Sequence, residues 1–268
     1  MILEEPILTK AIKGYTEFEV VGKRVQIPYH IARDQQAREQ KWKLWKFSSK
    51  GTPEQIHQEL EKTASRVGFD LKEATALEIN KFMTDHKIGI DCSGFVYQVL
   101  DPLVKAKTGK GIGSWVNRFK GFVGAIEKFI LAYERVRRIG TKDLARDLNS
   151  VPVMKIENIV PGDLIWHAAK HLDENKKRRR HVIVVTSLEV DDTGRELRRI
   201  NYAHSARETI PSGPHFGTID VIDPHDWLDK QKWKETMSNG TNYGEDFFGP
   251  SYRSGVRRLR CLAGVCER

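Results

Sequence analysis

The spacing of apolar residues changes near residue 150 of this 268-residue chain, and this change most constrains the fold. Before it, apolar residues recur three and four positions apart, as in amphipathic helices. After it, short runs rich in β-branched residues, such as residues 181–187, alternate with turn sequences such as residues 191–194. Helices grouped before hairpin-connected strands are typical of an α+β domain with an antiparallel sheet.

The first three helices are expected before residue 114. A capping pattern at Thr52 starts the first helix, and Gly68 closes it. The second is expected over residues 71–84. The third begins at or near Cys92 and ends or restarts at residues 101–102, where a proline follows an aspartate.

The later elements are mostly strands. Helical spacing continues over residues 114–150, and a further helix is expected at 227–234. Between these two stretches, a Pro-Gly-Asp turn at residues 161–163 leads into the first strand. The expected strands cover residues 164–166, 181–187, 197–205, 217–222 and 255–262.

The chain carries 45 Lys and Arg against 36 Asp and Glu, a net charge of +9 that favours an anionic partner. Nucleic acid, an acidic membrane surface and a carboxylate-rich substrate all fit this charge. Residues 176–180 are five consecutive cations directly before His181. They form either a solvated loop tip or a cationic rim that attracts carboxylates. We expect no nucleic-acid binding, because no aromatic stacking motif accompanies the run.

Targeting signals are missing from the sequence. The first residues lack the basic start and apolar run of a secretory signal, and no stretch has the roughly 18 to 20 apolar residues of a membrane span. We therefore expect a cytoplasmic protein with no membrane span, with non-classical export or phage-linked release as alternatives. Three cysteines cannot all pair, so we expect Cys92 to be a free thiol and Cys261 and Cys266 to be structural.

Cys92 stands where a thiol can become a nucleophile. A helix N-terminus lowers the pKa of a thiol because its unpaired backbone N–H groups favour negative charge. Asp91 and Ser93 are polar on both sides, and Gly94 removes a side chain, which favours an open turn. The alternative is that Cys92 is simply a small buried residue.

Four segments in one order, GIDCSGFVYQVL, VPGDLIW, RHVIVVTSL and NYAHSA, resemble the NlpC/P60 family of papain-like cysteine peptidases, which cleave bacterial cell-wall peptides. The resemblance spans roughly residues 89–206. It implies a papain-like fold in which the cysteine helix packs on a small antiparallel sheet. Residues 89–268 would form the catalytic core, with a helical insert at about 111–150, and residues 1–88 a helical extension packed on it.

The resemblance implies that Cys92 is the nucleophile, His181 the base and His204 the residue that orients the base. Elementary chemistry supports this reading. A base must reach the thiol, and a third group must hold the imidazole in one tautomer. Two adjacent antiparallel strands joined by a hairpin at residues 191–194 can bring His181 and His204 together.

The resemblance also implies a substrate pocket. In the family, residues flanking the cysteine and an upstream tyrosine hold the free amine of an N-terminal L-alanine. Asp91 and Ser93 match the flanking positions. Tyr29 is the best match to the tyrosine, although about sixty residues separate it from Cys92.

We therefore expect an enzyme that hydrolyses an amide bond in a peptidoglycan-derived peptide through a thioester, with the D-glutamyl–diamino acid bond as the family's usual target. The alternatives are a cysteine amidase or acyltransferase on a non-wall substrate, and a non-catalytic module that binds an anionic polymer. No metal or organic cofactor is expected. His167 and His171 are four apart, but they lie at a strand end and a loop rather than on one helix face.

Overall fold

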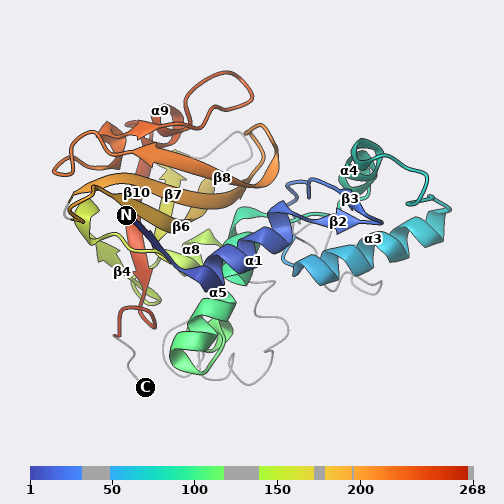
Figure 1. Cartoon of the computed structure of the whole chain (residues 1–268), viewed down its shortest axis with the longest axis horizontal. Helices are drawn as coiled ribbons and strands as arrows, with labels where there is room; N and C mark the ends of the chain where they lie inside the picture. Colours follow the sequence, from blue (N-terminus) through green and yellow to red (C-terminus); the bar gives the residue numbers. More distant parts are fainter. Residues whose placement is uncertain (32–48, 118–138, 172–178, 195, 265–268) are drawn as a thin grey trace.

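The computed structural model describes residues 1–31, 49–117, 139–171, 179–194 and 196–264. Within these residues the strands form an eight-stranded antiparallel sheet in the order β4-β10-β5-β6-β7-β8-β9, with β1 paired to β6 (Figure 1). The strands are β1 (Ile2–Glu4), β4 (Ser150–Val153), β5 (Leu164–Ala169), β6 (Arg180–Val190), β7 (Leu197–Ala206), β8 (Gly213–Asp220), β9 (Lys232–Trp233) and β10 (Tyr252–Leu259).

Some of the helices pack on the sheet. The described α-helices are α1 (Pro6–Thr16), α3 (Pro53–Val67), α4 (Ala76–Asp85), α5 (Cys92–Thr108), α8 (Thr141–Leu144) and α9 (Tyr243–Phe248). Helix α5 packs on β6 and β7 and is flanked by α1, whereas α9 contacts β5, β9 and β10 (Figure 1). Among the described residues, no helix is long and apolar enough to cross a membrane.

The sheet has a separate apolar core on each face. Alternate residues of a strand point to opposite faces. Val182 and Val184 of β6 accordingly join the core under α5, whereas Ile183 and Val185 join the core on the other face. The structure is thus mixed, with helix and a curled antiparallel sheet, as the α+β expectation requires.

The helix starts follow the capping residues. Thr52 accepts a hydrogen bond from the Gln55 amide, as predicted. The prediction for the second helix was wrong at its start: α4 begins at Ala76, because Thr75 and Glu78 form their own capping box.

Helix α5 does not end at Asp101-Pro102, contrary to expectation, but continues to Thr108. Proline removes one backbone hydrogen bond from a helix. The buried apolar face on both sides of Pro102, including Leu100 and Leu103, keeps the helix together. Gly109 then ends it in the left-handed conformation.

The later predictions need corrections. The helix expected at 227–234 is a short 3-10 turn, Leu228–Lys230, followed by β9, because Trp233 is buried and pairs with Ile219 of β8. The last two strands begin earlier than expected, at Gly213 and Tyr252.

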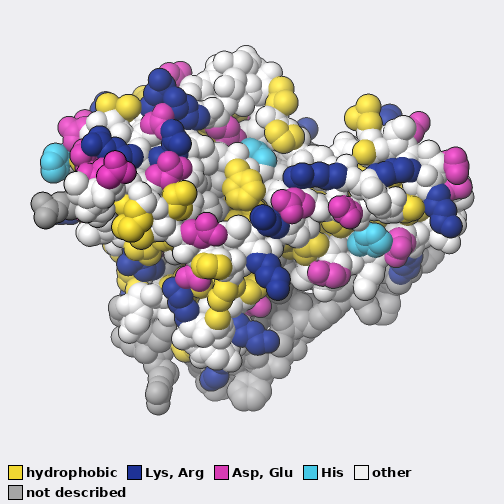
Figure 2. All heavy atoms as spheres, viewed as in Figure 1, with side chains coloured by type: hydrophobic (Ala, Val, Ile, Leu, Met, Phe, Trp, Pro, Cys, Tyr) yellow, Lys and Arg dark blue, Asp and Glu magenta, His cyan; other side chains and the backbone are white. Residues whose placement is uncertain are grey.

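Parts of several predictions lie outside the described residues. These are residues 118–138 in the middle of the helical insert, residues 176–178 among the five cations before His181, and Cys266. Arg179 and Arg180 are exposed. On the face drawn in Figure 2, cations and carboxylates are intermixed.

The N-terminal residues are divided between the sheet and a projecting lobe. Strand β1 pairs with β6, and α1 packs on α5. The hairpin of β2 (Glu19–Val20) and β3 (Lys23–Arg24) lies with α3 and α4 in the lobe at the right of Figure 1. The outline of the molecule is notched between this lobe and the rest (Figure 2).

Candidate active site

Cys92 is the first residue of α5 and lies against the start of β6. The Asp91 side chain caps the helix by accepting a hydrogen bond from the Gly94 amide at 2.6 Å. The Cys92 sulfur lies 3.7 Å from Thr141 Oγ1 and accepts a hydrogen bond from the backbone amide of Val182, the residue after His181. The fold therefore brings the cysteine helix to the strand that carries the predicted base, but the hydrogen bonds of the described residues include none between Cys92 and His181.

The Cys92 thiol is neutral at rest. It is only 5% exposed, and its burial, followed by the nearby Asp91 carboxylate, raises its pKa to about 11. The Lys50 ammonium, Thr141 and the Val182 amide oppose this rise without cancelling it. The helix N-terminus alone therefore does not ionise the sulfur.

Asp91 is engaged within the chain. Its carboxylate accepts hydrogen bonds from Lys50 Nζ at 2.9 Å, Ser49 Oγ at 3.1 Å and Ser93 Oγ at 3.0 Å. Gly94 permits the close approach, because a Cβ there would lie 2.3 Å from the Ser49 carbonyl oxygen. The predicted amine-binding residues Asp91 and Ser93 thus lie beside Cys92, but an ammonium of the protein itself already contacts them.

Tyr29 reaches the site despite its distance in sequence. It forms a parallel bridge with Ile90, in which the Ile90 amide donates to Pro28 at 3.1 Å and the His30 amide donates to Ile90 at 3.3 Å. Burial raises the pKa of the Tyr29 phenol, and the nearby Cys92, when it is ionised, and the Asp91 carboxylate raise it further. This pairing closes the sixty-residue gap and places Tyr29 near the other candidate residues.

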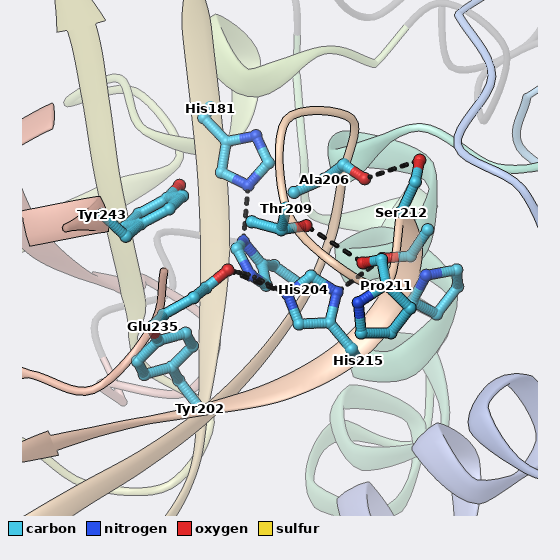
Figure 3. A network of polar contacts seen from close by, with 12 residues as sticks. His181, Tyr202, His204, Ala206, Thr209, Pro211, Ser212, His215, Glu235 and Tyr243 are labelled. Carbon is cyan, nitrogen blue, oxygen red and sulfur yellow. Dashed lines mark hydrogen bonds and ion pairs between the residues drawn. The ribbon is translucent and has the colours of Figure 1, made fainter. Parts of the chain in front are cut away.

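His181 and His204 meet across β6 and β7. His181 Nε2 and His204 Nδ1 are 2.8 Å apart, and the two rings are nearly perpendicular, at 86° (Figure 3). The expected contact between the two imidazoles is therefore present. Whether these residues act in catalysis remains a prediction.

A carboxylate continues the chain of contacts beyond His204. Glu235 Oε1 lies 3.0 Å from His204 Nε2 and 2.9 Å from His215 Nε2, and its other oxygen accepts a hydrogen bond from the Tyr202 hydroxyl (Figure 3). Burial disfavours the charged form of Glu235, but the two histidines hold its pKa well below the usual value. Glu235 is therefore ionised.

These contacts specify the tautomer of His181. A carboxylate only accepts hydrogen bonds, so His204 Nε2 carries a proton and donates it to Glu235. Burial lowers the pKa of His204 and keeps it neutral, so its Nδ1 accepts a hydrogen bond from His181 Nε2. Burial, followed by its histidine neighbours, likewise holds the pKa of His181 well below its ordinary value. His181 Nδ1 then carries a lone pair that can accept a proton.

His167 forms part of the wall of the site. It lies opposite His181 in the sheet, stacks on it at 5.4 Å, and contacts the Tyr243 hydroxyl through Nε2 at 3.0 Å. Burial, then His204, lowers the pKa of His167 to about 3. His171 is exposed beyond the end of β5, which agrees with the expectation that the two histidines do not share a helix face.

Sequence reasoning missed four residues that contact the predicted site residues: Lys50, Thr141, His215 and Glu235. For His215 a signal existed: a second hairpin after β7 pairs it directly with His204. Glu235 gave no signal, because a single glutamate after a short strand usually lies on the surface.

A scan against protein-family models, a search of curated proteins and a search of solved structures found no match for this chain. Its function must therefore be inferred from the thiol, the imidazoles and the carboxylate that the fold brings together.

Proposed function

We propose that the chain is a cysteine-dependent hydrolase that cleaves an amide bond through a thioester. Cys92 is the nucleophile and His181 the base, while His204 and Glu235 position His181. One observation carries the proposal: the Glu235–His204–His181 hydrogen-bond chain ends on the residue whose neighbour, Val182, donates its amide to the Cys92 sulfur.

The protonation states favour a mechanism in which proton transfer accompanies attack. His181 Nδ1 takes the thiol proton as the sulfur attacks the carbonyl carbon, and it later gives that proton to the leaving amine. A water molecule then cleaves the thioester. In this proposal, backbone N–H groups at the start of α5 stabilise the oxyanion.

The resemblance to NlpC/P60 peptidases supports a peptidoglycan-derived peptide as the substrate, with the D-glutamyl–diamino acid bond as the first target. The net charge of +9 fits a substrate that carries several carboxylates.

A cysteine amidase or acyltransferase on a non-wall substrate is the second candidate, and one observation favours it. Lys50 already pairs with Asp91 at 2.9 Å, and both side chains are buried. A substrate with a free N-terminal amine would have to compete with this internal ammonium. A substrate without a free amine would not.

The test is incubation of the full chain with a panel of defined wall peptides, each in free-amine and N-acetylated form, followed by mass spectrometry. We expect cleavage by the wild type, none by Cys92→Ala, and normal cleavage by Cys261→Ala, which removes another buried thiol. Cleavage that survives in Cys92→Ala would exclude the proposed mechanism. Preference for the acetylated peptides would favour the second candidate.

A further inference from the structure

Three potential metal ligands converge on the face of the sheet that carries His181. His204 Nε2, His215 Nε2 and Glu235 Oε1 lie 2.9 to 3.0 Å from one another. Their residues are 0%, 9% and 8% exposed, respectively. Tetrahedral ligands bound to one ion at about 2.0–2.2 Å lie about 3.3–3.6 Å apart, so these three atoms need to separate by only a few tenths of an ångström to bind one ion.

The backbone holds the three ligands together. His204 and His215 are direct partners in the pairing of β7 with β8. Glu235 follows β9, the next strand of the sheet. Two ligands thus come from a hairpin and the third from the adjoining strand end, which are rigid elements suited to fixed geometry.

Each ligand is also oriented by a second contact. His215 Nδ1 donates to the Gly213 carbonyl at 2.8 Å, and His204 Nδ1 contacts His181. The second oxygen of Glu235 accepts the Tyr202 hydroxyl. Outer contacts of this kind, to a carbonyl, an imidazole and a hydroxyl, orient metal ligands in proteins.

The charges at the cluster favour a cation. Because His215 Nδ1 donates to a carbonyl, a neutral His215 would turn the lone pair of Nε2 toward the Glu235 carboxylate at 2.9 Å. Two facing acceptors repel each other. Three arrangements remove the conflict: a second proton on His215, the His204 Nε2 proton shared between His215 Nε2 and Glu235, or a metal ion bound by all three residues.

We propose that His204, His215 and Glu235 bind a divalent transition-metal ion of the zinc class, with a fourth position left for water. Two imidazoles and one carboxylate are a donor set that such ions take. This assignment goes beyond the sequence, which led us to expect no metal.

The bound ion would switch off the base, a consequence that rests on the proposed function. A metal at His204 Nε2 moves the proton of His204 to Nδ1, which then donates to His181 Nε2. Neutral His181 then carries its own proton on Nδ1 and cannot accept one from Cys92. His204 and Glu235 therefore support catalysis without the ion and, together with His215, block it with the ion.

Metal binding is tested in the full-length Cys92→Ser chain, because a free thiol would itself bind zinc. Cobalt titration followed by visible absorption, and zinc titration by calorimetry, should both show one ion per chain. In that background, His215→Ala and Glu235→Gln should weaken binding by at least about a hundredfold, whereas the exposed His225→Ala should not. Circular dichroism confirms folding of each variant. Binding that is absent, or unchanged in both cluster variants, would overturn the site.

The switch is tested without a substrate, so that its failure is separate from failure of the proposed function. In ¹⁵N-histidine NMR spectra, zinc should move the His181 proton from Nε2 to Nδ1. Unchanged His181 signals at saturating zinc would refute the switch. If the wild type cleaves wall peptides, zinc should also stop cleavage and a chelator restore it; continued cleavage by the zinc-loaded enzyme would again refute the switch.

Discussion

Asp91 and Glu235 are both buried carboxylates at the candidate site, but different donors hold them. Asp91 pairs with Lys50 and caps the helix that begins with Cys92. Glu235 pairs with two histidines and a tyrosine, and it supports His181 through His204. One carboxylate therefore positions the proposed nucleophile, and the other positions the proposed base.

The difference lies in the chemistry of the partners. Asp91 accepts hydrogen bonds from a lysine ammonium and two serine hydroxyls, so its cluster has one arrangement. Histidines gain and lose protons and bind metals, so the Glu235 cluster has several. We therefore expect changes at Asp91 to act mainly on stability, and changes at Glu235 mainly on activity.

The largest expected effect on stability follows Asp91→Ala. It removes the helix cap and leaves the buried Lys50 ammonium without its carboxylate, so the free energy of unfolding should fall by about 3–5 kcal/mol. Urea unfolding measures it. Asp85→Ala is the control: Asp85 forms an exposed ion pair with Lys81, and its loss should lower stability by less than about 1 kcal/mol. Equal losses of stability in the two variants would show that Asp91 matters no more to stability than an exposed carboxylate.

Glu235→Gln should act on turnover. The Gln side chain can donate to His204 Nε2 and so reverse the tautomers of His204 and His181, lowering kcat by about 10²–10³-fold with little change in KM. Rates are measured on the peptide that the wild type cleaves. Glu208→Gln, at a nearby exposed position, should leave kcat unchanged. A loss of activity that merely tracks a loss of folded protein would reduce Glu235 to a structural role.

Cys92 should be alkylated slowly at neutral pH. Because its pKa is raised to about 11, the thiolate fraction should rise about tenfold for each pH unit between pH 7 and 10. The rate of iodoacetamide modification, followed by mass spectrometry, reports it. In the urea-unfolded protein, the thiolate fraction of Cys92 should stop rising above about pH 9. A fast, pH-independent rate in the folded protein would instead indicate a preformed thiolate–imidazolium pair.

Tyr202→Phe should have the smallest effect. It removes one hydrogen bond to the Glu235 carboxylate but keeps both histidines in place, so stability should fall by about 1.5 kcal/mol and kcat a few-fold. Thermal unfolding and initial rates measure the two effects. Tyr252→Phe, at a half-buried position, serves as the matched control. A loss of kcat as large as that of Glu235→Gln would show that Tyr202, too, is needed to keep the carboxylate in position.

Local sequence signals predicted much of the fold. The Thr52 capping box, the helix that begins at Cys92 and the strands at 181–187 and 197–205 each depend on residues close together in the chain. The contact between His181 and His204 followed from a hairpin. The helix expected at 227–234 does not form, because pairing of residues 232–233 with β8 overrides the local helix preference of this segment.

The sequence by itself determined the order of helices and strands and which thiol begins a helix, because capping and periodicity act over a few residues. Only the tertiary structure decided which groups support that thiol and its base. Lys50 meets Asp91 and Glu235 meets His204 through contacts that span 41 and 31 residues. Such contacts form because burying a charge requires a partner, and the folded chain rather than the local sequence supplies it.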